Sequence, residues 1–595
     1  MEVKIKDALL KGVEAHKAGK LQEADQFYTA ILKAMPNHPD ANHNMGVLAV
    51  GVGKIQEALP FFKTALEANS NIAQFWLSYI DALMKLNQIA DAKAVLDEAK
   101  SKGIKSVGFD QIEKRLIGLE KGIEVNVASS KSQDPPEDQL QNLINLYSQG
   151  QFQKALTQCS QLLKDFPNSI NLYNLIGSSN KGLGKLEEAI EAFKKALSLK
   201  PDFADAYYNM GNTLKVQGKL EEAIEAFKKA LSLKPDFADA YNNMGIALKV
   251  QGKQEKAIEA FKKALSFKPD YTEAYYNMGI ALKVQGKLEE AIEAFKKALS
   301  FKPDYAEAYN NMGNALQDHG KLDEAIDAFK KALSFKPDYT KSYWNLFGTS
   351  RNIEEAKKWI EQCLKVDPNY EKAKQILSAL KFYEGDKSEF GALVKSTLKD
   401  HPYVRSFTWA FSLPKLPPLY FNRWALFDHM IELSEKNRPF YEFGVWRGEA
   451  FKHLIKTFKK GYGFDTFEGL PEDWHTKKAG TYSSEGNIPN VGGGEFIVGK
   501  FEDTLPEFFA IKRPMASIIN FDADLYSSTI CALKFSKPVI DEHTILIFDE
   551  FIMNENWEED EYKALEEFCY NNHFEYEVLG ISFFTKQVAV RLIAI

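Results

Sequence analysis

The chain has 595 residues, of which 45% are hydrophobic and 26% are charged, and its formal net charge at pH 7 is −7. This length exceeds what one hydrophobic core supports, so we expect several domains. The mild negative charge offers no basic footprint for nucleic acid, and no stretch of about 20 apolar residues predicts a membrane span. The four cysteines are scattered without a CxxC pair, and the N-terminal segment is amphipathic rather than a signal peptide. We therefore expect a soluble, cytoplasmic protein.

A spacing of 34 residues dominates the first two thirds of the sequence. One proline and two glycines recur at this interval, together with small and large apolar residues at helical spacing. The prolines are Pro167, Pro201, Pro235, Pro269, Pro303 and Pro337. These residue types at this spacing resemble the tetratricopeptide repeat, in which two helices form a unit and successive units stack into a superhelix with a concave groove.

The repeat is uneven along the chain, and this unevenness suggests domain limits. Near the N-terminus, Pro36, Gly46 and Gly53 keep the register. We predict a first repeat block over residues 1–121, a polar linker over 122–136 and a main block over 137–384. Phe347 replaces the glycine at which the two helices of a unit meet, which is typical of a terminal capping repeat.

The first helix of each unit carries an asparagine that the repeat fold places on the concave side. A side-chain amide donates and accepts hydrogen bonds at once, so a ladder of such amides suits the backbone of an extended peptide. Asparagine is also common at this position of tetratricopeptide repeats in general, so a structural role stays open. We expect the repeats to bind a protein or peptide partner or to mediate self-association. The predicted groove residues are Asn209, Asn243, Asn277 and Asn311.

Residues 385–595 follow different rules, because the 34-residue period stops and strand-like apolar runs appear. A helical lead-in precedes these runs, which alternate with helix-like segments. This order predicts an α/β doubly wound sheet that ends in an antiparallel hairpin. The predicted strands are Phe440–Gly444, Gly461–Asp465, Glu495–Val498, Ala516–Asp522, Thr544–Asp549, Tyr576–Phe584 and Gln587–Ile595.

Three acidic residues follow two of these runs directly. Asp522 ends one strand, and Asp549 and Glu550 end the next. The carboxyl ends of parallel strands meet at the edge where open α/β sheets bind ligands. Carboxylates that converge there repel each other unless a positive charge holds them, and a hard divalent cation prefers oxygen ligands. We therefore predict that Asp522, Asp549 and Glu550 bind a metal ion such as Mg²⁺.

The turn after the first strand predicts a cofactor site beside these acids. It reads E-F-G-V-W-R-G, so Glu442, Gly444 and Gly448 provide an acid, a tight turn and a close helix approach. Trp446 stands where a dinucleotide motif has its second glycine, and the looser pattern is that of S-adenosylmethionine-dependent methyltransferases. Asp465 ends the second strand, where an acid accepts hydrogen bonds from ribose hydroxyls or caps the following turn.

Five segments together make a more specific resemblance over residues 400–595. They are FYEFGVWRG, FDTFEGLPEDW, GKFEDTLP, INFDADLYSST and LIFDEF. In this order and spacing they resemble the macrocin O-methyltransferase family, whose members are metal-dependent sugar O-methyltransferases on the class I, Rossmann-like fold. The resemblance implies S-adenosylmethionine as cofactor, and magnesium held at Asp522, Asp549 and Glu550. Glu550 departs from the family, where a shorter Asp or Asn is more usual.

The remaining predictions concern the chemistry. Methyl transfer needs a deprotonated hydroxyl, and the candidates for the base are Asp524, Tyr526 and His475; for His475, an exposed loop position is the competing interpretation. The resemblance implies an acceptor hydroxyl on a sugar or glycosylated compound. The alternative is a repeat adaptor whose methyltransferase-like domain binds without catalysis. The repeats also suggest a glycosyltransferase, but the strand-end acids and the glycine turn argue against it.

Overall fold

The computed structural model describes residues 2–17, 20–86, 88–104, 109, 112, 113, 116, 134–484 and 486–595. The predicted linker at 122–136 lies outside these residues, except for 134–136. The chain forms two compact units, Met1–Pro136 with Lys164–Asn168 and Glu137–Leu163 with Ser169–Ile595. The predicted limit at residue 384 lies inside the second unit. Within the described part, no helix is both long and apolar enough to cross a bilayer.

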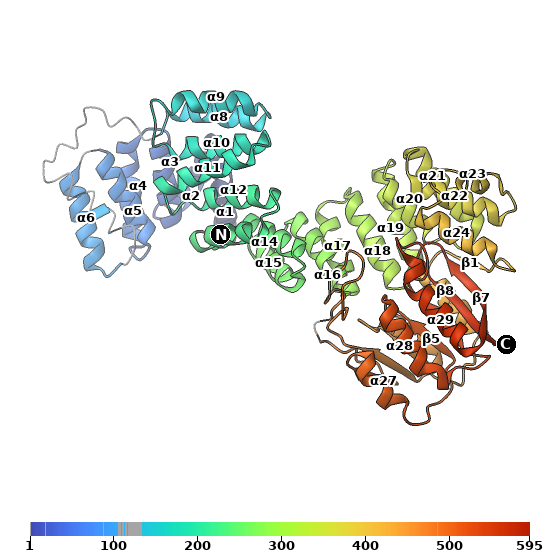
Figure 1. Ribbon diagram of the computed structural model, residues 1–595. Helices are drawn as coiled ribbons and strands as arrows, with labels where there is room; N and C mark the ends of the chain where they lie inside the picture. The colour runs from blue at the N-terminus through green and yellow to red at the C-terminus, as the bar shows by residue number, and fades with distance from the viewer. Residues whose placement is uncertain are drawn as a thin grey trace. The chain divides into compact units, whose positions relative to one another are not determined.

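Antiparallel helix pairs make up the repeats of both units (Figure 1). In the first unit they are α1 (Glu2–Lys17), α2 (Leu21–Ala34), α3 (Pro39–Gly51), α4 (Ile55–Ala68), α5 (Ala73–Lys85) and α6 (Ile89–Ser101). In the second they are α8 (Glu137–Ser148), α9 (Phe152–Leu162), α10 (Ile170–Gly182), α11 (Leu186–Leu199), α12 (Ala204–Val216), α13 (Leu220–Leu233), α14 (Ala238–Val250), α15 (Gln254–Phe267), α16 (Thr272–Val284), α17 (Leu288–Phe301), α18 (Ala306–Asp318), α19 (Leu322–Phe335), α20 (Thr340–Phe347), α21 (Ile353–Val366) and α22 (Glu371–Tyr383).

A glycine and a phenylalanine hold each pair together, as α14 and α15 illustrate. The ring of Phe261 is fully buried and lies against Gly245. A Cβ atom at residue 245 would come within 2.6 Å of this ring, so only glycine lets the helices approach this closely. The 34-residue spacing of the sequence repeats this contact from unit to unit, which makes the array regular.

The C-terminal region contains one mixed sheet among the described residues. Its strand order is β1-β7-β8-β6-β5-β2-β3-β4. Strands β2 to β6 are parallel where they pair, and β8 is antiparallel to both β6 and β7, which confirms the predicted hairpin. The strands are β1 (Leu419–Tyr420), β2 (Phe440–Phe443), β3 (Gly461–Asp465), β4 (Gly494–Val498), β5 (Ile518–Phe521), β6 (Ile545–Phe548), β7 (Phe574–Ser582) and β8 (Val588–Ala594).

Helices cover both faces of this sheet, and the strands alternate between the two cores. Ile518 packs with the cluster of α25 and α26, whereas Ile519 packs with that of α27, α28 and α29. Because side chains alternate along a strand, Glu442 and Asn520 point to the α25 side. The helices are α23 (Ser388–Leu393), α24 (Pro402–Ser412), α25 (Arg423–Leu433), α26 (Glu449–Phe458), α27 (Phe501–Phe509), α28 (Tyr526–Ser536) and α29 (Glu561–Asn572), with short 3₁₀ turns at Lys537–Val539 and Trp557–Glu559.

The last repeats and the sheet share one hydrophobic core. Phe347 of α20 packs against Phe421 and Phe584, with ring centroids 5.6 and 5.8 Å apart. Trp344 of the same helix also contacts Phe584, which lies in the turn between β7 and β8. The C-terminal end of the repeat array is therefore built into the sheet region.

Candidate functional site

A cavity of about 710 Å³ lies at the carboxyl ends of four parallel strands. Asp465, Asp522 and Asp549, which end or directly follow β3, β5 and β6, line it together with Glu442, the last residue but one of β2. The strand order reverses between β2 and β5, because β3 lies beyond β2 and β6 lies beyond β5. Such a reversal opens a crevice in which α/β sheets bind ligands.

The glycine turn after β2 shapes one side of this cavity. Gly444 lines it with a φ of +88°, and a Cβ atom there would come within 1.9 Å of the carbonyl oxygen of Asp522. No other residue fits this position without moving the backbone after β5. Gly448 precedes α26 with a φ of +73°, lies beside Pro489, and is not among the residues that line the cavity.

Glu442 is the most deeply buried of the acids that line the cavity. It is 1% exposed, and its Oε1 accepts a hydrogen bond of 3.2 Å from the amide of Asn520. Its Oε2 has no hydrogen-bond partner among the described residues. Burial raises the pKa of Glu442 to about 8, although the Asn520 hydrogen bond lowers it. A buried oxygen without a partner is costly, so a ligand that donates a hydrogen bond here would be favoured.

Asp465 holds the two loops beside the cavity. Its carboxylate oxygens accept hydrogen bonds of 2.6 Å from the backbone N–H groups of Trp446 and Phe467. Burial raises the pKa of this carboxyl, and the backbone hydrogen bonds oppose that shift. Asp465 thus caps the turn, as one of its two predicted roles requires. A carboxylate has further acceptor positions, so its contact with a ribose stays a prediction.

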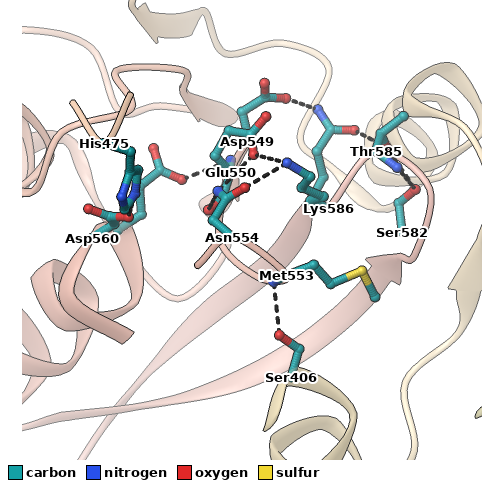
Figure 2. A network of polar contacts seen from close by, with 12 residues as sticks. Ser406, His475, Asp549, Glu550, Met553, Asn554, Asp560, Ser582, Thr585 and Lys586 are labelled. Carbon is teal, nitrogen blue, oxygen red and sulfur yellow. Dashed lines mark hydrogen bonds and ion pairs between the residues drawn. The ribbon is translucent and has the colours of Figure 1, made fainter. Parts of the chain in front are cut away.

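The three predicted metal ligands do not gather at one point. The guanidinium of Arg423, the first residue of α25, lies between two of them. Its Nη2 is 2.5 Å from Asp549 and 3.6 Å from Asp522. The carboxylate of Glu550 instead accepts hydrogen bonds from Lys586 at 2.9 Å and Asn554 at 2.8 Å (Figure 2).

This arrangement does not fit a preformed metal centre. Among the described residues, no three His, Cys, Asp or Glu side chains are placed to hold a metal ion. The physical reason is that Arg423 and Lys586 already neutralise the acids that the sequence assigns to a cation. Metal binding at Asp522, Asp549 and Glu550 therefore stays a prediction, and it would require Arg423 to move.

Glu561 belongs to the same acid cluster, and the sequence interpretation missed it. It is fully buried in the first turn of α29, and its Oε2 accepts a hydrogen bond of 3.3 Å from the backbone N–H of Glu550. Burial, followed by the charge of Asp549, raises its pKa well above the ordinary value. Its spacing from Leu565 and Phe568 places it on the apolar face of the helix, so the signal was present within the acidic run 558–561. Arg423 had no comparable signal.

The three candidate bases occupy different places. Asp524 lines the cavity in a left-handed backbone conformation, with a φ of +59°. Burial and the charge of Glu550 raise its pKa well above the ordinary value. The hydroxyl of Tyr526 donates to Glu567 at 2.6 Å, and His475 pairs with Asp560 at 2.8 Å (Figure 2). Neither Tyr526 nor His475 is among the residues that line the cavity.

The asparagine ladder of the repeats is tied to neighbouring units. The amide of Asn311 donates to the hydroxyl of Tyr276 at 2.9 Å, and Asn277 accepts from Lys249 at 3.2 Å. The other two have similar partners: Asn243 donates to Tyr208 at 3.1 Å, and Asn209 donates to Asn174 at 3.0 Å. These bonds give the ladder a structural role between units, and peptide binding by it stays a prediction.

Comparison with known proteins concerns the repeats. The family model described as "TPR repeat" matches residues 181–218, 211–252, 247–286 and 281–320. Models described as "Tetratricopeptide repeat" match residues 49–103, 143–169, 306–339 and 345–377.

Individual relatives are similar over parts of the chain. The "Peroxisomal targeting signal receptor" of Saccharomyces cerevisiae is 28% identical over 30% of this chain, and the match spans 32% of the receptor, so about a third of its length. The crystal structure of MamA is 34% identical, with a TM-score of 0.27, over 28% of this chain and 97% of that one. That of YrrB, titled as having an unusual peptide-binding site, is 25% identical, with a TM-score of 0.28, over 31% and 95%. The family matches confirm that both predicted blocks contain tetratricopeptide repeats.

Proposed function

We propose that this protein binds a protein partner through its repeats and methylates a hydroxyl group in the cavity of its C-terminal region. The family matches support the first half. The observation that carries the second half is the cavity at the strand reversal, bordered by Gly444 and by the unpartnered oxygen of Glu442. The doubly wound order of β2, β3, β5 and β6 supports a nucleotide-like cofactor at this place.

The residues present fit S-adenosylmethionine as this cofactor. Its amino group and its ribose donate hydrogen bonds, which the carboxyl oxygens of Glu442 and Asp465 are able to accept. Gly444 keeps the wall free of a side chain. When bound, this cofactor supplies an electrophilic methyl group.

Asp524 is our proposed base. Of the three candidate bases it alone lines the cavity, so its carboxylate is the one that an acceptor hydroxyl bound there is able to reach. The proton of the acceptor hydroxyl passes to Asp524 as the oxygen forms its bond to the methyl carbon. With S-adenosylmethionine bound, this transfer would break its methyl–sulfur bond and release S-adenosylhomocysteine, and Asp524 would then return the proton to solvent. No step in this scheme passes through a metal ion.

The acceptor and the partner are proposed by chemical class. A sugar hydroxyl as acceptor rests on the resemblance of residues 400–595 described above. The yeast relative is named as a receptor for a targeting signal, and by analogy we propose a peptide segment as the partner of the groove. A cytoplasmic location and self-association through the repeats also stay proposals.

Calorimetric titration with S-adenosylhomocysteine, with and without magnesium, tests the enzyme proposal. We expect wild type to bind, and Gly444→Val to lose binding because its side chain overlaps the backbone of Asp522. Gly492→Ala is the matched control, since a Cβ atom there meets nothing within 4 Å. Absence of binding by wild type under both conditions would overturn the proposal. Binding that requires magnesium would return the cation to the mechanism.

A second candidate is a repeat adaptor whose C-terminal region binds a cofactor without catalysis. Two observations favour it: the comparisons match the repeats, and Arg423 lies between the acids where a catalytic cation was predicted. Transfer of a tritiated methyl group from S-adenosylmethionine to a panel of glycosides distinguishes the two candidates. Label that stays on the cofactor, with S-adenosylhomocysteine binding intact, supports the adaptor.

A further inference from the structure

The repeats contribute directly to the cavity of the C-terminal region. Lys283 from the last turn of α16 lines it, as do Asn314 and Asp318 from α18. The same cavity is lined by Glu442 and Asp522 from the sheet. The site is therefore incomplete without the repeats.

The repeat sequence changes where it meets the cavity. In the two units upstream, Ile246 and Ile280 occupy the position of Asn314, whereas α12, which does not line the cavity, has Asn212 there. At the position of Asp318 those units have a valine, Val250 and Val284. Two apolar positions thus become polar in α18, and both new side chains line the cavity. Folding of the repeat does not require these polar residues, because the upstream units fold with the apolar ones.

Direct hydrogen bonds fix this part of the repeats against the sheet region. The indole N–H of Trp424, in α25, donates to the carbonyl oxygen of Gln317 at 2.9 Å. The guanidinium of Arg447 donates to the carbonyl oxygen of Val284 at 3.0 Å. Both bonds go to the backbone of the last turns of α16 and α18. These turns are consequently held in place as a fixed wall, together with the side chains they carry.

The chemistry of this wall suits a neutral ligand with several hydroxyl groups. Lys283 and Asp318 form an ion pair of 3.0 Å, so their charges balance each other. With the amide of Asn314 they still offer several donors and acceptors. Trp424 and Trp446 also line the cavity and provide flat apolar surfaces. Polar groups that fix orientation, combined with aromatic surface, are the usual composition of a small-molecule site.

We propose that Lys283, Asn314 and Asp318 form the acceptor subsite of this cavity and select a neutral monosaccharide unit. The inference rests on the proposed function and extends it, because it makes the repeats part of acceptor recognition rather than only a tether. Asn314 and Asp318 are then positioning residues for the acceptor hydroxyl. Transfer of the proton still falls to Asp524.

Saturation-transfer NMR on the full chain tests this subsite. The probes are methyl α-glucopyranoside, methyl α-rhamnopyranoside and methyl N-acetyl-β-glucosaminide, each with saturating S-adenosylhomocysteine. The variant Asn314→Ile with Asp318→Val restores the residues of the upstream units, so it is expected to fold. The matched control, Ile246→Asn with Val250→Asp, makes the reverse change in α14, which does not line the cavity.

We expect at least one glycoside to receive saturation from wild type and from the control. In the α18 variant its affinity falls about tenfold, which corresponds to about 1.4 kcal/mol of lost hydrogen bonding. An unchanged affinity in this variant, or no saturation of any glycoside by wild type, overturns the subsite. Calorimetry with S-adenosylhomocysteine separates the two levels: normal cofactor binding by both variants shows that the cofactor site stands even if the subsite fails.

Discussion

The repeat array and the sheet region relate sequence to structure in opposite ways. In the array, the role of a residue follows from its place in a 34-residue unit, and its partners lie in the same unit or the next. Phe261 lies on Gly245 and Asn311 contacts Tyr276 in this way. In the sheet region, Arg423 pairs with Asp549, which is 126 residues away along the chain. Local periodicity therefore reveals the scaffold, whereas the site depends on pairings that periodicity does not record.

Removal of the phenylalanine ring that lies between the two helices of a repeat is expected to have the largest effect on stability. Phe261→Ala leaves a cavity in a fully buried position and should lower the free energy of unfolding by about 3–5 kcal/mol. The measurement is urea unfolding followed by circular dichroism. Phe267→Ala is the control, because that side chain is 46% exposed. Cofactor affinity should persist in folded Phe261→Ala, since residue 261 does not line the cavity; its loss would show that the two regions are more tightly coupled than their contacts indicate.

The pairing of Arg423 provides the next largest effect. Arg423→Ala leaves Asp522 and Asp549 without a positive partner and should lower the free energy of unfolding by about 2–3 kcal/mol. Magnesium should then raise the melting temperature of this variant more than that of wild type. The control in the repeats is Arg351→Ala, because Arg351 and Asp323 form an exposed pair that contributes little. Equal losses in the two variants would contradict the contrast between the regions.

Glu442 links stability to pH. Its pKa in the folded protein is about 8, against an ordinary value of 4.5. Between these values the folded state keeps a proton that the unfolded state has lost, so this group makes the protein less stable as pH rises, and the change ends above about pH 8. Glu442→Gln removes this dependence. Its stability relative to wild type should therefore increase by about 2 kcal/mol from pH 5 to pH 6.5, given at most about 1.4 kcal/mol per pH unit.

Thermal unfolding at several pH values measures this difference. Glu432→Gln is the control, because the Glu432 side chain is 74% exposed. A difference between Glu442→Gln and wild type that stays constant with pH would show that Glu442 is ionised in the folded state.

The smallest effect concerns the asparagine ladder. Tyr276→Phe removes the hydroxyl that accepts a hydrogen bond from Asn311 and should cost about 1 kcal/mol in urea unfolding. Tyr275→Phe, at a neighbouring position of α16, is the control; its ring stacks on Phe301, and no hydrogen bond of its hydroxyl is found among the described residues. If Tyr276→Phe leaves the free energy of unfolding unchanged, the asparagine ladder does not stabilise the fold, and peptide binding becomes the better explanation for it.

The sequence predicts the local elements of this protein well and its long-range side-chain pairs poorly. The ends of the seven predicted strands agree with those of β2 to β8 to within two residues, because apolar runs and glycine turns mark these strands locally. The sequence also places Asp522 and Asp549 beside the cavity. It does not indicate that the cation beside them is Arg423, since this residue comes from α25, between β1 and β2 and far from both acids in the sequence. The sequence also proposes Tyr526 and His475 as bases. It does not indicate that their side chains pair with Glu567 and Asp560 outside the cavity lining.

The contact of Phe584 with Trp344 and Phe347 has a consequence for biosynthesis. In the finished protein this ring covers the C-terminal end of α20, and Gly348 lies directly beneath it. A ribosome makes Phe347 long before it makes Phe584, so the nascent array emerges with an uncovered aromatic end. Exposed apolar ends of this kind bind chaperones or one another until they are covered. Completion of the β7–β8 turn thus supplies the side chain that finishes this aromatic contact, about 240 residues after α20 is made.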